Sequence, residues 1–72
     1  MSEKLEAEAE LCEAAADELD KASAHCRTAA AHFREREIPR AAAHAWAAFG
    51  HVRLAEDALT EQARRHAVES QP

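Results

Sequence analysis

The sequence has no tyrosine, one glycine, one tryptophan and two phenylalanines. Glycine-rich phosphate loops need several glycines, so nucleotide sites of that kind are excluded. Few β-branched residues and no alternation of apolar and polar residues argue against strands. Charges interrupt every apolar stretch, so we expect no membrane span, and nothing in the sequence resembles a signal peptide.

Cysteine is also scarce, with only Cys12 and Cys26. On one helix these residues would lie about 21 Å apart, because each residue rises 1.5 Å. That separation is far beyond disulfide reach. We therefore expect reduced, buried thiols and a cytoplasmic location. Seven arginines against two lysines, with abundant alanine, are typical of a GC-rich bacterial genome.

Large hydrophobic side chains are few, although 47% of the 72 residues are apolar. Alanine supplies 20 of the apolar residues, and the larger ones number 12: Met1, Leu5, Leu11, Leu19, Phe33, Ile38, Trp46, Phe49, Val52, Leu54, Leu59 and Val68. Burying a large side chain contributes roughly 1.5–3 kcal/mol, whereas ordering one residue costs on the order of 1.5 kcal/mol. So thin a core predicts packing against a copy of the chain or against another protein.

The net charge of −5 is distributed unevenly. Residues 1–20 carry a net charge of −7, and residues 21–54 carry a net charge of +4. Phosphate repels an acidic chain, so we expect no nucleic-acid partner. The asymmetry has two interpretations: acids and bases placed to suit the helix dipole, or charge matching with a partner, including an antiparallel dimer.

The abundant alanine, glutamate, leucine and arginine favour helix throughout. We expect Ser2 to be the N-cap of a first helix over about residues 2–37. Ile38–Pro39 predicts a hinge at 37–39, because proline disfavours helix in the preceding residue and suits the first turn of the next helix. A second helix is expected over about residues 39–67, followed by a frayed tail at 68–72. The predicted fold class is therefore all-α: an antiparallel two-helix hairpin that assembles into a coiled-coil four-helix bundle.

Both predicted helices carry apolar stripes. In the first, Leu5, Cys12, Leu19, Cys26 and Phe33 recur every seven residues. With the positions three further on (Glu8, Ala15, Ala22, Ala29 and Arg36) and four further on (Ala9, Ala16, Ser23, Ala30 and Glu37), they predict a heptad seam of one large and two small residues per repeat. In the second, one stripe (Ile38, Ala42, Ala45, Phe49 with Ala48, Val52, Ala55, Leu59, Ala63) can cover the first helix, and another (Ala43, Trp46, Ala47, Gly50, Leu54, Ala58) needs a further surface. The mid-helix glycine predicts close approach by a neighbouring helix. The predicted interface residues are Trp46, Gly50, Leu54, Phe49, Cys12 and Leu19.

Four histidines lie near the predicted hinge. Folding about Ile38 places His25 level with His51, and His32 level with His44. Imidazole and thiolate bind zinc or copper, so His25, His51, His32, His44 and Cys26 are candidate metal ligands. We call each level pair of histidines a rung, and the two rungs would lie about 10 Å apart along the helices. The alternatives are polar residues at the edge of an interface, or an interface that responds to pH.

No catalytic constellation is present, and we expect the chain not to be an enzyme and to need no cofactor. The sequence favours a non-catalytic interaction, scaffold or small regulatory protein that binds itself or another protein, as a homodimer or as an accessory subunit of a larger complex. The second hypothesis is a helical metal-binding protein that uses the histidine rungs.

Overall fold

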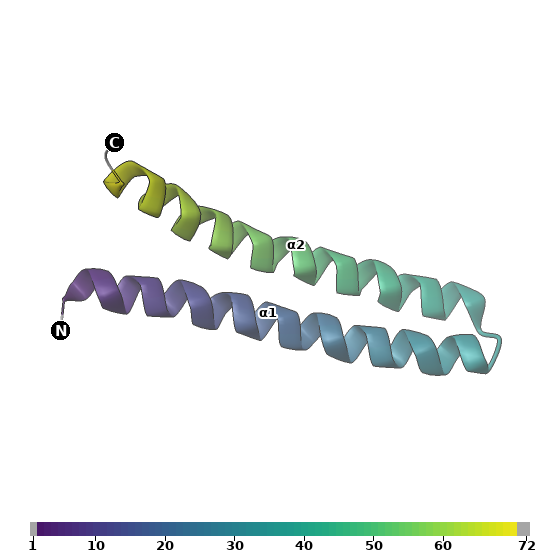
Figure 1. The fold of residues 1–72 in the computed structure, drawn as a ribbon. Coiled ribbons are helices and arrows are strands. Elements are labelled where there is room, and N and C mark those ends of the chain that lie inside the picture. Colours follow the sequence, from purple (N-terminus) through teal and green to yellow (C-terminus); the bar gives the residue numbers. More distant parts are fainter. Residues whose placement is uncertain (1, 71–72) are drawn as a thin grey trace.

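The computed structural model describes residues 2–70, which form two helices joined by a short turn (Figure 1). Helix α1 spans Glu3–Arg34 and helix α2 spans Ile38–Glu69. They lie antiparallel and pack on each other, so the predicted all-helical hairpin is confirmed. Neither helix, over the described residues, is long and apolar enough to cross a membrane. The tail predicted at 68–72 is helical to Glu69, and residues 71–72 lie outside the described part.

Helix α1 begins as the sequence predicts. Ser2 has extended backbone geometry, and its Oγ accepts a hydrogen bond of 3.2 Å from the backbone N–H of Leu5. Glu3 and Glu6 stand in the first turn, where carboxylates stabilise the positive end of the helix dipole.

The turn lies earlier than the predicted hinge at 37–39. Helix α1 ends at Arg34, and Arg36 adopts a left-handed conformation with φ 63°. The N–H of Glu37 donates to the carbonyl of His32 at 2.9 Å, and the N–H of Arg36 donates to the carbonyl of Phe33 at 3.0 Å. These two bonds form a Schellman motif, which closes a helix through one left-handed residue. Ile38 and Pro39 therefore begin α2, with the proline in its first turn.

The residues buried between the helices are all alanines. Exposure of 0–5% is found at six positions, which we call the alanine seam: Ala15, Ala22 and Ala29 in α1, and Ala41, Ala48 and Ala55 in α2. Ala15, Ala22 and Ala29 belong to the predicted seam and are buried, whereas its large members Leu5, Leu19 and Phe33 remain 46–57% exposed. Small side chains at the contact let two helices approach closely, and the seven-residue period is the one predicted.

Only the small residues Ala48 and Ala55 of the first predicted stripe of α2 are buried against α1 within residues 2–70. Ile38, Phe49 and Leu59 of the first stripe are 44–62% exposed, and Trp46 of the second is 78% exposed. The face of α2 that contacts α1 carries Ala41, Ala48 and Ala55, so it overlaps the small-residue edge of the first stripe. Both cysteines are exposed and free, so the expectation of buried thiols was also wrong.

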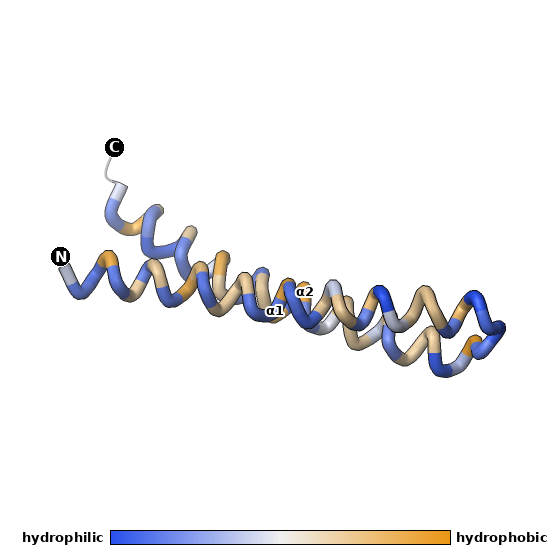
Figure 2. Tube along the Cα trace, turned by 90° about the horizontal axis from the view of Figure 1, so that it is seen from below, coloured by the Kyte–Doolittle hydropathy of each residue, from blue (hydrophilic) through white to orange (hydrophobic). Residues whose placement is uncertain are grey.

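The hairpin is long and one layer thick, measuring 53 × 25 × 12 Å. Its radius of gyration is 16.6 Å, against about 11 Å for a compact domain of this length. Apolar and polar segments alternate along both helices, and the helices separate towards the chain ends (Figure 2). The large apolar side chains therefore lie on the outside of a flat molecule.

Candidate functional site

Four histidines form one continuous column along the contact between the helices. The ring centroids of His32 and His44 are 5.5 Å apart, those of His44 and His25 are 5.2 Å apart, and those of His25 and His51 are 5.4 Å apart. The shortest contact joins Nδ1 of His25 to Nδ1 of His44 at 3.0 Å. A hydrogen bond of this length requires one ring to donate and the other to accept.

A carboxylate stands at each end of the column. Nδ1 of His51 donates to Oε2 of Glu18 at 2.6 Å, and Nδ1 of His32 lies 3.6 Å from Oε2 of Glu37. The hydrogen bond from His51, together with the charge of Lys21, lowers the pKa of Glu18 below its ordinary value. The column therefore holds four imidazole rings in line between two carboxylates.

The pKa of Glu37 is also lowered. The first cause is a side-chain hydrogen bond with Glu35, and the charges of His32 and Arg40 act in the same direction. Arg40 donates to Glu37 at 3.3 Å within the first turns of α2. The carboxylate of Glu37, which lies in the turn, thus contacts both Arg40 of α2 and His32 of the column.

The structure brings together the histidine pairs that the sequence placed level, but it does not separate them into two rungs about 10 Å apart. The diagonal contact between His25 and His44 joins both pairs. Cys26 contributes nothing to the column: it follows His25 and so faces away from the contact, where it is exposed. Within residues 2–70, no three His, Cys, Asp or Glu side chains surround a point where a metal ion could bind.

A second feature lies on the flank of the alanine seam away from the column. We call it the apolar face: Leu5, Cys12, Leu19, Cys26 and Phe33 from α1, and Ile38, Phe49, Val52 and Leu59 from α2. Leu19 and Leu59 each come four residues after a buried alanine, and equivalent positions of two antiparallel helices meet on the same side. A contact of 3.3 Å between Gln62 of α2 and Sγ of Cys12 supports this arrangement.

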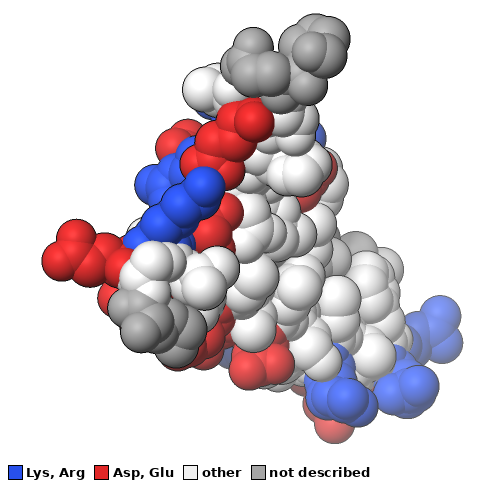
Figure 3. Space-filling model, turned by 60° about the vertical axis from the view of Figure 1, so that its left-hand side comes forward, with Lys and Arg blue, Asp and Glu red and all other residues white. Residues whose placement is uncertain are grey.

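The apolar face is almost free of charge. The row Leu5 to Phe33, with the small residues between its members (Ala9, Ala16, Ser23 and Ala30), has no charged residue. The matching row of α2 includes one, Glu56, although the chain has 23 charged residues. Among residues 2–70, six of the nine exposed large hydrophobic side chains lie on this face. Figure 3 shows a broad uncharged area along the hairpin with charged groups at its borders.

The predicted interface residues divide between two surfaces. Cys12, Leu19 and Phe49 belong to the apolar face. Trp46, Gly50 and Leu54 lie outside it, although the ring of Trp46 is 6.5 Å from that of Phe49. Nothing lies within 4 Å of a Cβ added at Gly50, so no helix of this chain makes the predicted close approach.

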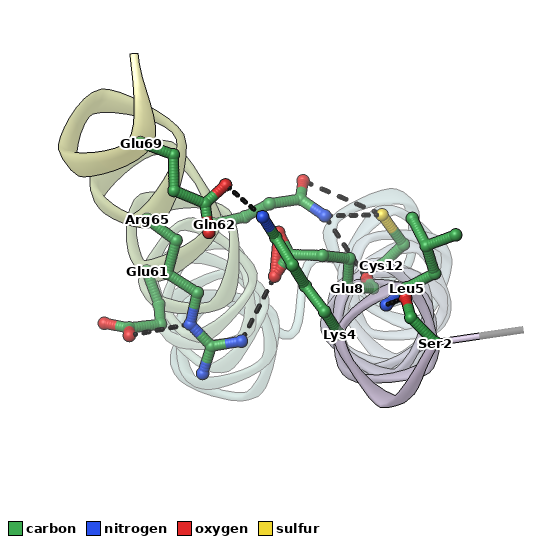
Figure 4. A network of polar contacts seen from close by, with 9 residues as sticks. All are labelled: Ser2, Lys4, Leu5, Glu8, Cys12, Glu61, Gln62, Arg65 and Glu69. Carbon is green, nitrogen blue, oxygen red and sulfur yellow. Dashed lines mark hydrogen bonds and ion pairs between the residues drawn. The ribbon is translucent and has the colours of Figure 1, made fainter. Parts of the chain in front are cut away.

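The end of the hairpin opposite the turn is held by polar contacts (Figure 4). Lys4 and Glu69 form an ion pair of 2.6 Å, and Arg65 pairs with Glu8 at 3.1 Å. Arg65 also pairs with Glu61 at 3.1 Å, and these two carboxylates raise its pKa. Long side chains bridge the helices here because the alanine seam stops at Ala15 and Ala55.

Sequence reasoning missed the two carboxylates of the column. Glu18 lies seven residues before His25 and continues the same row of positions, so the period could have revealed it. Glu37 could not be found in this way, because its place depends on where the turn closes. Comparison with family models, with curated proteins and with solved structures gives no match to this chain.

Proposed function

We propose that this chain is a non-catalytic interaction protein that acts through self-association. Two hairpins pack apolar face against apolar face and form a homodimeric four-helix bundle. The partner is protein rather than nucleic acid, since the chain is acidic. Two free, exposed thiols suit a reducing compartment such as the bacterial cytoplasm.

The observation that carries this proposal is the surface area. The hairpin exposes 5599 Å², whereas a compact monomer of 7.9 kDa exposes about 4,400 Å². The excess of about 1,200 Å² exceeds the roughly 800 Å² that each partner buries in a standard interface. Packing two apolar faces together would remove this excess and bury the side chains that the alanine seam leaves outside.

A second copy fits this face better than a charged partner does. Its α1 row presents no charged group with which a foreign protein could form an ion pair, and it alternates large and small side chains. Such a surface interlocks with another of the same kind, as in helix bundles. The flat shape also offers both helices to the partner at once.

Light scattering of the purified chain tests the proposal. We expect a mass of twice 7.9 kDa. Leu19→Glu should give the monomer, because it places a charge at the centre of the apolar face. Leu54→Glu is the matched control: Leu54 is 50% exposed against 46% for Leu19, but it lies outside the face.

A monomeric wild-type chain with stable helices would overturn the proposal. Loss of assembly in Leu54→Glu but not in Leu19→Glu would instead place the interface on the Trp46–Leu54 side, as expected for an accessory subunit that docks there on a host protein.

The second candidate function is metal binding, favoured by the two Nδ1 atoms of His25 and His44 that converge to 3.0 Å. A zinc or copper ion would need a further ligand, which His51 or His32 could supply after rotation of its ring. Equilibrium dialysis with Zn²⁺ and with Cu²⁺ tests this. His25→Ala and His51→Ala should abolish binding, while His66→Ala, at the far end of α2, should not. Absence of bound metal in the wild type would end this hypothesis.

A further inference from the structure

The apolar row of α1 has mirror order along the helix. Leu19 is its midpoint, Cys12 and Cys26 stand seven residues to either side, and Leu5 and Phe33 stand fourteen. A second α1 laid antiparallel on this row, centred on Leu19, would therefore place thiol opposite thiol and large apolar residue opposite large apolar residue. The small residues between them allow the two helices to approach closely.

A row of charged residues borders this stripe on the side away from α2. Its members each follow a stripe residue: Glu6, Glu13, Asp20, Arg27 and Arg34. All five are exposed, and over residues 2–70 none of their side chains forms an ion pair or a hydrogen bond. Other acids and bases of α1, such as Lys4 and Glu8, pair with α2. This row is acidic at one end and basic at the other.

The polarity of the row distinguishes two orientations. Antiparallel pairing brings Glu13 beside Arg27 of the second copy, and Glu6 beside Arg34 of the second copy. Two-fold symmetry repeats both pairs and gives four cross-subunit ion pairs. Parallel pairing would place Glu13 against Glu13 and Arg27 against Arg27, which is unfavourable. Asp20 lies beside the axis and faces its own copy, so it makes the only like-charge contact of the row.

The positions of α2 agree with a two-fold axis beside Leu19. Glu8 of α1 pairs with Arg65 of α2, so Leu19, eleven residues after Glu8, lies at the same height along the hairpin as Leu54, eleven residues before Arg65. The ion pair Lys4–Glu69 gives the same register of the two helices. Phe49 and Leu59 of the apolar face each lie five residues from that level. A two-fold axis through it therefore sets Phe49 against Leu59 of the second copy.

We propose that the chain dimerises with α1 antiparallel to α1 of the second copy, about a two-fold axis beside Leu19, with Cys12 opposite Cys26 of the second copy and Glu13 paired with Arg27 of the second copy. This arrangement rests on the self-association proposed above and specifies its orientation.

Thiol cross-linking with a short bismaleimide tests the orientation. The wild type should give a covalent dimer. Cys12→Ser and Cys26→Ser should each give none alone, because the remaining thiols of the two copies stand about 21 Å apart. A mixture of the two variants should again cross-link, with one thiol from each chain.

Charge reversal at Glu13 and Arg27 tests the antiparallel orientation independently of the thiols. Glu13→Arg should raise the dimer dissociation constant about fivefold to tenfold, since two attractive pairs become repulsive. Adding Arg27→Glu should restore wild-type affinity. Asp20→Asn should tighten the dimer. Circular dichroism of each variant controls for helix content.

Light scattering separates the two possible failures. If the wild type is a monomer, both the proposed self-association and the proposed antiparallel orientation are contradicted. If it is a dimer in which single-cysteine variants cross-link with themselves, or in which the wild type does not cross-link, the antiparallel arrangement is overturned while self-association stands. Failure of Arg27→Glu to rescue Glu13→Arg also overturns it.

Discussion

Nδ1 of His25 lies 3.0 Å from Nδ1 of His44, and this contact joins the pair His32–His44 to the pair His25–His51. The bond exists only while one ring can accept. The centroids of the two rings are 5.2 Å apart. Carboxylates stand at the two ends of the column, where Glu18 contacts His51 and Glu37 contacts His32.

Replacing His44 should weaken the hairpin. His44→Phe keeps an aromatic ring but cannot form the 3.0 Å hydrogen bond with His25, so its melting temperature should fall below that of the wild type. His66→Phe is the control, because His66 contacts Ser70 near the end of α2 rather than the column. Thermal melts followed by circular dichroism measure both variants. An equal melting temperature in the wild type and in His44→Phe would contradict the role of the column.

Glu18 should stabilise the fold above pH 5 and lose this effect in acid. Its pKa is lowered in the folded chain, chiefly by the hydrogen bond from His51. A lowered folded pKa contributes stability above the unfolded value of about 4.3, and the contribution disappears as the pH falls through the folded value. Glu18→Gln should lower the urea midpoint at about pH 6 and match the wild type near pH 3.

Asp17→Asn provides the matched comparison for this prediction. Asp17 is the neighbouring acid, is exposed and points away from the contact with α2. We expect its removal to leave the urea midpoint nearly unchanged at both pH values. A pH-independent effect of Glu18→Gln would show that lost packing, rather than the ionised hydrogen bond, is responsible.

The alanine seam should tolerate no larger side chain. Ala48 is 4% exposed, so Ala48→Leu would force the helices apart and should cost about 1–3 kcal/mol of unfolding free energy. Ala24→Leu, at an exposed position of α1, should change it by less than about 0.5 kcal/mol. Urea titrations followed by circular dichroism, at one protein concentration, measure both. A stabilised Ala48→Leu would mean that the helices pack less closely than described.

Gly50→Ala should stabilise the chain. An added Cβ meets no atom within 4 Å, and alanine favours the helix interior over glycine by about 0.8–1.0 kcal/mol. Thermal melts and light scattering of the variant test this together. If the gain appears and the dimer persists, Gly50 lies outside every interface. If the substitution instead weakens assembly, a neighbouring copy approaches α2 at this glycine.

The helices and their antiparallel pairing could be predicted from local signals. Ser2 marks the start of α1, and Pro39 marks the start of α2. The turn was predicted too late in the sequence because Glu35 and Glu37 are ordinary helix formers. Arg36 gives no sequence signal for its left-handed conformation, which glycine usually adopts at this position. The stop signal is a backbone geometry rather than a residue type.

The phase of the packing could not be predicted from hydrophobicity. The period of seven was correct, and the predicted seam included Ala22 and Ala29, which are buried. It also included Leu19 and Phe33, because large side chains usually fill cores, and these remain exposed. The level pairs of histidines followed from the fold, whereas the contact between His25 and His44 required the actual register of the helices.

The end of the hairpin opposite the turn has a different dynamic character from the rest. There the helices separate, and the bridging groups are exposed charged side chains such as Lys4 and Glu69, whose pairs contribute little. Backbone amides of the first and last helical turns should exchange with solvent deuterium fastest, and those near Ala29 and Ala41 slowest. Exchange followed by mass spectrometry should show protection rising steadily towards the turn. The hairpin should therefore open first at the end that holds both chain termini.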